Sequence, residues 1–173
     1  SKYKEGDVVV YCDSGNTINV EGYERFGEYC SLIQNWDAIC FQIRYKEKEW
    51  NKKDTIEAVL NAMDKLGYYE VCETNQIASH FLMLKKCDKV MNMISVWYNL
   101  ACNYHLIDDS KSMNPNYPEF KEHRHDQAII SLLLKLNRNT LVLNDCFSDD
   151  KTEKTFLLQN EEKIKPIIPS RKK

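Results

Sequence analysis

Short apolar runs alternate with amphipathic stretches along most of this chain, and this alternation limits the folds open to it. The apolar runs are rich in β-branched side chains and bounded by turn residues, as buried strands are: residues 7–12, 38–43, 77–84 and 140–143. Apolar side chains spaced by three or four indicate helices over residues 23–33, 54–66, 88–101 and 126–136. Apolar strands separated by helices predict an α/β fold with a sheet covered on both faces.

Local signals refine this outline. Asp54 and Glu57 have the spacing of a capping box at the start of a helix, and Gly67 is expected to end that helix. Residues 68–72 give only a weak strand signal. Residues 103–122 are predicted to form the longest loop of the chain. We expect one domain over residues 1–148 and a charged, frayed tail over residues 149–173.

Charge and hydropathy exclude several classes of protein. Lysine and arginine number 24 against 26 aspartates and glutamates, so the net charge of −2 argues against a general nucleic-acid binder. No apolar run reaches the roughly 18 residues that span a membrane. The seven cysteines include no C-x-x-C pair, and no signal peptide is visible, so we expect free, mostly buried thiols and a cytoplasmic location.

Asp13 is the first candidate for chemistry. It follows an apolar strand and opens the turn Asp13-Ser14-Gly15. Ligands of open α/β sheets bind beyond the carboxyl ends of the strands. A carboxylate there suits a divalent cation that is also held by phosphates, whereas a turn aspartate that caps the following helix is the structural alternative.

The polar stretch of residues 122–127 is the second candidate. It stands directly before the very apolar helix expected over residues 126–136. A polar cluster fixed to a buried helix either lines a cleft or stabilises the helix start, where Asp126 suits the helix dipole. His123 and His125 have a spacing that allows metal binding, although two histidines are a weak signal.

Three further groups are candidates on weaker signals. Asp108 and Asp109 lie in the long loop, and Gln76 precedes an apolar run. Lys52 and Lys53 precede a helix, where two cations attract a diphosphate or form ordinary surface charge.

In their order along the chain, these residues resemble a family of small glycosyltransferases from large DNA viruses and bacterial polysaccharide loci. The likeness covers about residues 4–140. Its most specific part is Arg124-His125-Asp126-Gln127 with Ser131, where the family pattern is R-H-D-Q-S-I-F-S and this chain has Ala128 and Ile130 in place of the first Ser and the Phe. Asp13-Ser14-Gly15 stands where the family has D-A-G.

The resemblance implies a GT-A-like, Rossmann-like mixed sheet flanked by helices and a metal-dependent transfer. A sugar would move from a nucleoside-diphosphate sugar, with UDP as the assumed carrier, to a hydroxyl of a glycan or polysaccharide. Asp13 would hold Mn²⁺ or Mg²⁺, which neutralises the charge of the leaving diphosphate. The donor would be bound by Ser14, Gly15, Lys52, Lys53, His123 and Arg124. The acceptor or the sugar would be bound by Gln76, Gln127, Asp108 and Asp109.

Asp126 and His125 would be the catalytic residues of this family member. In an inverting enzyme Asp126 would be the general base, and in a retaining enzyme it would orient the donor sugar. Only Ser1 to Gly6 precede the aspartate strand, where the family has a nucleotide-binding segment. We therefore expect a GT-A fold that is incomplete at its N-terminus.

Two alternatives remain. A non-catalytic member of the same fold would bind a glycan or a partner. A metal phosphohydrolase of the helical HD type would use His125 and Asp126, with further ligands from His80, His105 and Asp145.

Overall fold

A computed structural model describes residues 2–144 and 166–169 of the chain. Its contacts divide the chain into two units. The first unit contains Ser1–Arg44, His80–Val90 and Asn139–Lys173, and the second contains Tyr45–Ser79 and Met91–Arg138.

A mixed sheet is the main β-structure. Its order is β1 (Val8–Cys12), β5 (Phe81–Lys85), β3 (Ala38–Lys46) and β4 (Asn75–Ile77), and β6 (Thr140–Leu143) also pairs with β3. β5 is antiparallel to both β1 and β3, whereas β6 is parallel to β3. A second, two-stranded antiparallel sheet joins β2 (Asn16–Ile18) to β7 (Ile167–Pro169).

The α-helices have these bounds: α1 Tyr23–Leu32, α2 Glu47–Trp50, α3 Lys53–Ala62, α4 Asp88–Ala101 and α5 His125–Leu136. The short 3₁₀ helices are η1 Val20–Gly22, η2 Ile33–Asn35, η3 Tyr69–Glu73 and η4 Tyr104–Leu106. Together with the sheet, these helices confirm the mixed α/β class expected from the sequence.

The described residues contain no helix of the length and apolarity that a membrane crossing needs.

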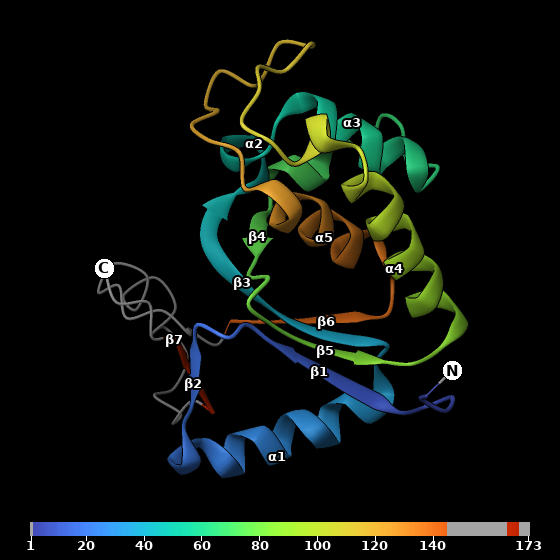
Figure 1. Cartoon of the computed structure of the whole chain (residues 1–173), viewed down its shortest axis with the longest axis vertical. Helices are drawn as coiled ribbons and strands as arrows, with labels where there is room; N and C mark the ends of the chain where they lie inside the picture. Colours follow the sequence, from blue (N-terminus) through green and yellow to red (C-terminus); the bar gives the residue numbers. More distant parts are fainter. Residues whose placement is uncertain (1, 145–165, 170–173) are drawn as a thin grey trace. The chain divides into compact units, whose positions relative to one another are not determined.

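The core of the first unit forms where α1 lies across the sheet (Figure 1). Tyr29 from α1, Phe41 from β3 and Phe81 from β5 are almost fully buried, and their ring centroids lie 5.2 to 6.5 Å apart. Ile39 and Met83 complete this layer. Alternate residues of each strand therefore supply the apolar face that α1 covers.

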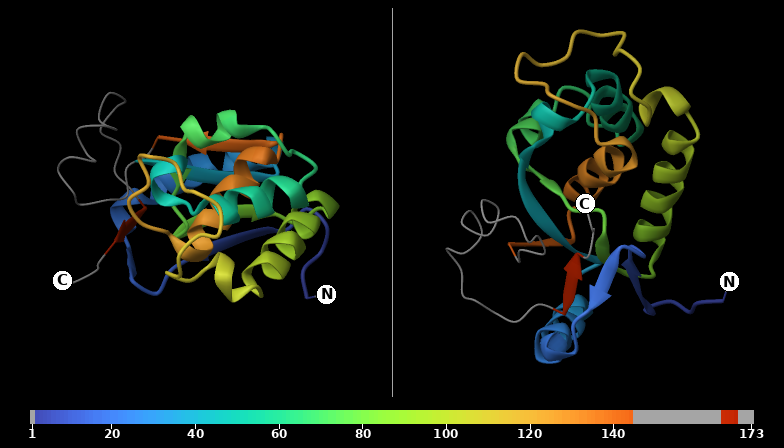
Figure 2. Two further views of the ribbon diagram at one scale, coloured as in Figure 1. Left: turned by 90° about the horizontal axis from the view of Figure 1, so that it is seen from above. Right: turned by 60° about the vertical axis from the view of Figure 1, so that its left-hand side comes forward.

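The core of the second unit is built around α5. Most of its apolar side chains are fully buried, including Ile129, Leu132 and Leu133. α5 packs against α3 and β4, and Figure 2 shows α3 and α5 side by side. A helix that is apolar on most of its surface needs such neighbours on several sides, as its sequence predicts.

Several expected elements differ from the structure. Residues 77–84 are two strands, β4 and β5, separated by residues 78–80, and residues 68–72 lie mainly in the 3₁₀ helix η3. β1 is an edge strand rather than a buried one, and both Val10 and Tyr11 are exposed. Because consecutive side chains point to opposite faces, neither face of the sheet is fully covered at this edge.

The expected capping box is also wrong. α3 begins at Lys53, and its first amides are capped by a distant loop: Lys53 N–H donates to Asn116 Oδ1 and Asp54 N–H to Ser112 Oγ. The helix ends at Ala62, well before Gly67. A sequence pattern cannot reveal caps from a loop about 60 residues away, which satisfy the same free amides.

The cysteines are less buried than expected. Cys40 and Cys72 are buried, whereas Cys12, Cys30 and Cys102 are exposed. Cys146 and most of the predicted tail lie outside the described residues. Within the described part of the tail, Ile167–Pro169 form β7.

Candidate functional site

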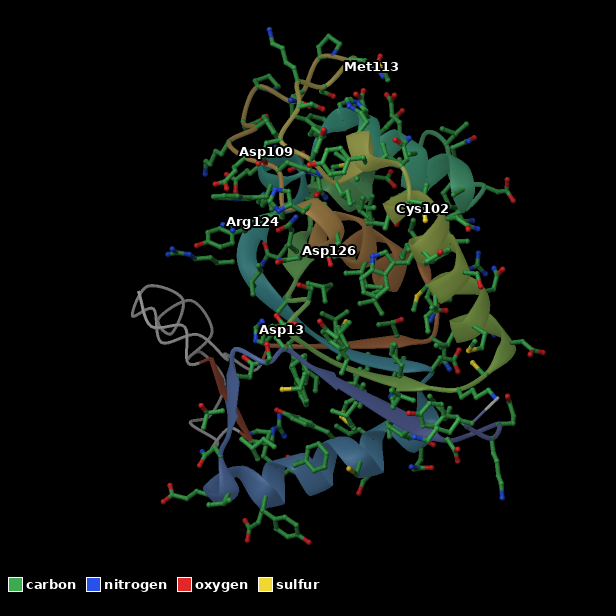
Figure 3. All side chains as sticks on the ribbon, in the orientation of Figure 1. Asp13, Cys102, Asp109, Met113, Arg124 and Asp126 are labelled. Carbon is green, nitrogen blue, oxygen red and sulfur yellow. The ribbon has the colours of Figure 1, made fainter. Side chains whose placement is uncertain are left out.

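The candidate site of the second unit lies at the start of α5. Residues 121–124 are fixed to α2 through their backbone, since Lys121 N–H donates to Glu49 O (2.8 Å) and Arg124 N–H to Trp50 O (3.1 Å). The guanidinium of Arg124 lies over the Trp50 ring at 4.4 Å from its centroid. Figure 3 shows Arg124 at the entry to α5, with Asp126 on its first turn. Two backbone hydrogen bonds and a cation–π contact therefore hold the residues before α5 against α2.

His125 forms a pair with Asp109 from the long loop. His125 Nε2 lies 2.9 Å from Asp109 Oδ1, and both side chains are exposed. An ionised carboxylate only accepts hydrogen bonds, so Nε2 carries the proton that is shared with Asp109. His125 has a φ of +50°, in the left-handed region that is uncommon for residues with a side chain. This backbone conformation gives the imidazole its position.

Asp126 has an exposed carboxylate on the first turn of α5. No residue of the described ranges donates a hydrogen bond to it or pairs with it. Its neighbour Gln127 instead donates through Nε2 to Ile77 O (3.2 Å), which ties the helix to β4. Asp126 is thus available to a ligand, whereas the Gln127 side chain makes a structural hydrogen bond.

Lys52 is a buried structural cation rather than a surface residue that attracts diphosphate. Its side chain is 2% exposed, and its ammonium donates to Asp108 Oδ1 (2.9 Å), to Ser110 O (3.3 Å) and to His105 O. These partners use all three ammonium protons. The sequence-based roles of Lys52 in donor binding and of Asp108 in acceptor binding are therefore not supported by this arrangement.

Asp54 holds the other side of the same loop. Its carboxylate accepts hydrogen bonds from the backbone of Met113 (2.6 Å) and Asn114 (3.0 Å) and from His105 Nε2 (2.8 Å). Burial alone would raise the pKa of the Asp54 carboxyl, but the hydrogen bonds from His105, Asn114 and Met113 outweigh it and hold this pKa well below its usual range. The carboxylate is thus ionised and fixes the loop to the start of α3.

A hydroxyl joins the Asp54 and Lys52 groups. Ser110 Oγ donates to Asp108 Oδ1 and also contacts His105 Nδ1 at 2.9 Å. His105 Nε2 lies 2.8 Å from Asp54 Oδ2. The Ser110 hydroxyl and the His105 ring therefore link the carboxylate that binds Lys52 to the carboxylate that fixes the start of α3.

His123 is buried and its ring is fully used by the backbone. Nε2 lies 2.8 Å from Leu106 O, to which only an N–H can donate, and Nδ1 accepts from Lys52 N–H at 3.3 Å. The imidazole must therefore be neutral. The pKa of His123 is lowered to about 4, mainly by burial. The hydrogen bond to Leu106 O raises this pKa, and the positive charge of Lys52 lowers it further. As arranged, His123 has no ring nitrogen to offer a diphosphate or a metal.

Gln76 also belongs to the interior. It is fully buried, and its Nε2 donates to Asn51 Oδ1 (3.3 Å). Asn51 in turn donates to Glu47, which accepts from Ser131 Oγ and pairs with Lys135. The predicted contact of Gln76 with an acceptor is therefore not supported, and Ser131 belongs to this internal network.

Lys53 is likewise engaged. Its ammonium lies 3.9 Å from the ring centroid of Tyr69 and 4.9 Å from that of Tyr117, and 3.5 Å from Glu57 Oε1. Cation–π contacts of this kind hold the loop against α3 and leave little of the charge for a phosphate.

In the first unit, Asp13 occupies the turn between β1 and β2. Asp13 N–H donates to His80 O (2.9 Å), and Asn16 N–H donates to Asp13 O (3.0 Å). Since a strand follows, the alternative that Asp13 caps a helix is wrong, and the exposed Ser14 and Gly15 do not offer a helix N-terminus to a phosphate.

The Asp13 carboxylate fits a divalent cation only as one of its ligands. It is half-buried, and Oδ1 accepts from Tyr11 Oη at 2.6 Å, which leaves further lone pairs on the carboxylate. Residues 2–144 and 166–169 contain no group of three or more His, Cys, Asp or Glu that could hold a metal ion. A cation at Asp13 would therefore depend on oxygens of a bound diphosphate, as Mg²⁺ sites often do.

The structure brings together residues that no sequence spacing connects. Trp50 underlies Arg124, and His105 pairs with Asp54, although these partners are more than 50 positions apart. Neither pair has a local signature in the sequence.

Comparisons with protein-family models, curated proteins and solved structures found no match to this chain. The mixed α/β architecture also contradicts the helical fold that the HD phosphohydrolase alternative requires.

Proposed function

We propose that this chain is a metal-dependent glycosyltransferase of GT-A-like fold, which moves a sugar from a nucleoside-diphosphate sugar to a hydroxyl of a glycan or polysaccharide. One observation carries the proposal: Asp126 and His125 of the family motif stand exposed on the first turn of α5, and no described residue pairs with the Asp126 carboxylate. The other polar residues of this region mostly have internal partners. An unpaired acid beside an oriented imidazole is suited to a substrate with hydroxyl groups.

The residues available for the donor are fewer than the resemblance implies. In the second unit, Arg124 offers its guanidinium beside Trp50. In the first unit, taken by itself, Asp13 offers a carboxylate to Mn²⁺ or Mg²⁺. When bound, the cation would supply neutralisation of the charge on the leaving diphosphate. Asp126 would accept hydrogen bonds from sugar hydroxyls, because its carboxylate has unused lone pairs and lies in solvent.

A second function is favoured by a specific observation. Lys52, Lys53 and His123 were expected to bind the donor, and all three are engaged by residues of the fold. A member that binds a glycan without transferring a sugar needs no donor site. Its ligand would contact the same exposed Asp126 and His125.

Calorimetry with nucleoside diphosphates and nucleotide sugars separates these functions. Titrations would use the chain and its Asp13→Asn variant, each with and without Mn²⁺. Binding that requires both Mn²⁺ and Asp13 supports the transferase. Circular dichroism provides the control that the variant is folded.

A folded chain that binds none of these nucleotides with Mn²⁺ overturns the transferase proposal. Binding of an oligosaccharide without nucleotide, weakened by Asp126→Asn, then supports the glycan-binding function.

A further inference from the structure

We infer that His125, oriented by Asp109, takes the proton of the acceptor hydroxyl, and that Asp109 is a positioning residue and not an acceptor ligand. The inference rests on the proposed function. It gives to His125 the role of base that the family resemblance suggested for Asp126.

The proton positions of His125 support this role. Because Nε2–H donates to Asp109 Oδ1, the neutral ring carries its lone pair on Nδ1. None of the described residues makes a hydrogen bond to Nδ1. A free lone pair on an imidazole held by a carboxylate at its other nitrogen is the arrangement of a general base.

The residue that precedes each member of the His125–Asp109 pair is fixed by the fold. Asp109 follows Asp108, whose carboxylate is tied to the buried ammonium of Lys52. His125 follows Arg124, whose N–H is bonded to Trp50 O. Buried or backbone contacts thus fix the residue before each exposed side chain, which limits the loss of order that weakens most surface pairs.

The backbone of His125 adds an independent observation. Its φ of +50° is an uncommon conformation for a residue with a side chain, and it occurs at the first residue of α5. Backbone strain of this kind gathers at sites where a side chain must be aimed. Here it aims the imidazole at the loop that carries Asp109.

The chemical step balances without further reactants. The acceptor oxygen forms a bond to the anomeric carbon as its proton passes to Nδ1 of His125. The bond from that carbon to the diphosphate oxygen breaks, and the diphosphate leaves with the electron pair. The resulting imidazolium is stabilised by Asp109 and later releases its proton to water.

The first test needs no sugar substrate. Diethylpyrocarbonate transfers its carbethoxy group to a neutral imidazole nitrogen, and mass spectrometry measures the rate at His125. The rate is measured at about pH 9, above the ordinary pKa range of an imidazole, so that the nucleophilicity of the neutral ring decides it. Asp109→Asn should lower this rate about two- to fivefold, the size expected for an exposed pair. Glu122→Gln is the matched control, because it removes one exposed carboxylate that also lies close to His125 in the sequence. Equal rates in Asp109→Asn and wild type would overturn the positioning role.

The second test measures transfer from the nucleotide sugar that binds in calorimetry. His125→Gln should lower kcat about 100-fold or more and leave the donor KM unchanged. Asp109→Asn should lower kcat less and change its pH profile, and Asp109→Glu should restore part of the rate. Full transfer by His125→Gln with loss in Asp126→Asn would overturn the inference alone, whereas absence of donor binding by wild type overturns the proposed function and this inference with it.

Discussion

The buried His123 makes the stability of this chain sensitive to mild acid. Its pKa in the folded chain is about 4, against an ordinary value of 6.5. Between these two values the unfolded chain binds a proton that the folded chain does not bind. Stability is therefore lost as the pH falls from 6.5 towards 4, and the contribution is constant below 4.

The magnitude follows from the size of the shift. One pKa unit corresponds to about 1.36 kcal/mol, so the full shift is worth roughly 3 kcal/mol. Between pH 7.5 and pH 4.5 His123 therefore contributes roughly 2 to 3 kcal/mol to the change in unfolding free energy. The side chain is 3% exposed, so solvent screening reduces this value little.

His123→Asn removes the titration and keeps an oxygen that can accept from Lys52 N–H. At pH 7.5 we expect this variant to be less stable by about 1 to 3 kcal/mol, since Leu106 O loses its donor. Its loss of stability between pH 7.5 and pH 4.5 should be smaller than that of wild type by roughly 2 to 3 kcal/mol. Urea unfolding followed by tryptophan fluorescence, at equal ionic strength, measures both quantities.

His123→Phe is the companion variant. It should show the same reduced sensitivity to pH with a larger loss of stability at pH 7.5, because both ring hydrogen bonds disappear. An NMR titration of His123 gives the pKa directly. A midpoint near 6.5, or equal pH sensitivity in wild type and both variants, would refute the reasoning.

Three further predictions follow from buried contacts. Glu47→Gln should lower the free energy of unfolding by about 3 to 5 kcal/mol in urea titrations, because it leaves the charge of Lys135 without its buried partner. Phe81→Ala should cost about 3 to 5 kcal/mol in the same assay, because it opens a cavity in the aromatic layer of the first unit. Asp54→Ala should speed amide hydrogen exchange at Met113 by about 10- to 100-fold, because that N–H loses a charged acceptor.

Two of these predictions have a matched control. Lys121→Ala breaks an exposed ion pair with Glu49 and should change stability by less than about 1 kcal/mol. If it costs as much as Glu47→Gln, burial does not decide the value of these pairs. The amide of Asn137, which bonds to Leu133 O, should exchange at an unchanged rate in Asp54→Ala. Similar acceleration at both amides would mean global destabilisation instead of a released loop.

The candidate site could be predicted in part. The polar stretch of residues 122–127 was found from its position before an apolar helix, and the structure gives Asp126 the exposure that a ligand contact requires. Lys52 and His123 were predicted for the same site and are buried instead. A charged residue in a sequence is read as a surface residue, because the partners that make its burial tolerable come from elsewhere in the chain.

The sequence by itself determined the elements whose signals are local. The periodicity of α4 and the apolar runs of β1 and β6 mark their positions, since side-chain spacing and β-branching act within a few residues. Only the tertiary structure decided what depends on distant partners. The start of α3 is capped by the loop at residues 112–116, and the protonation of His123 is set by Lys52 and Leu106. Capping and desolvation depend on which groups meet in space, and no spacing along the chain specifies that.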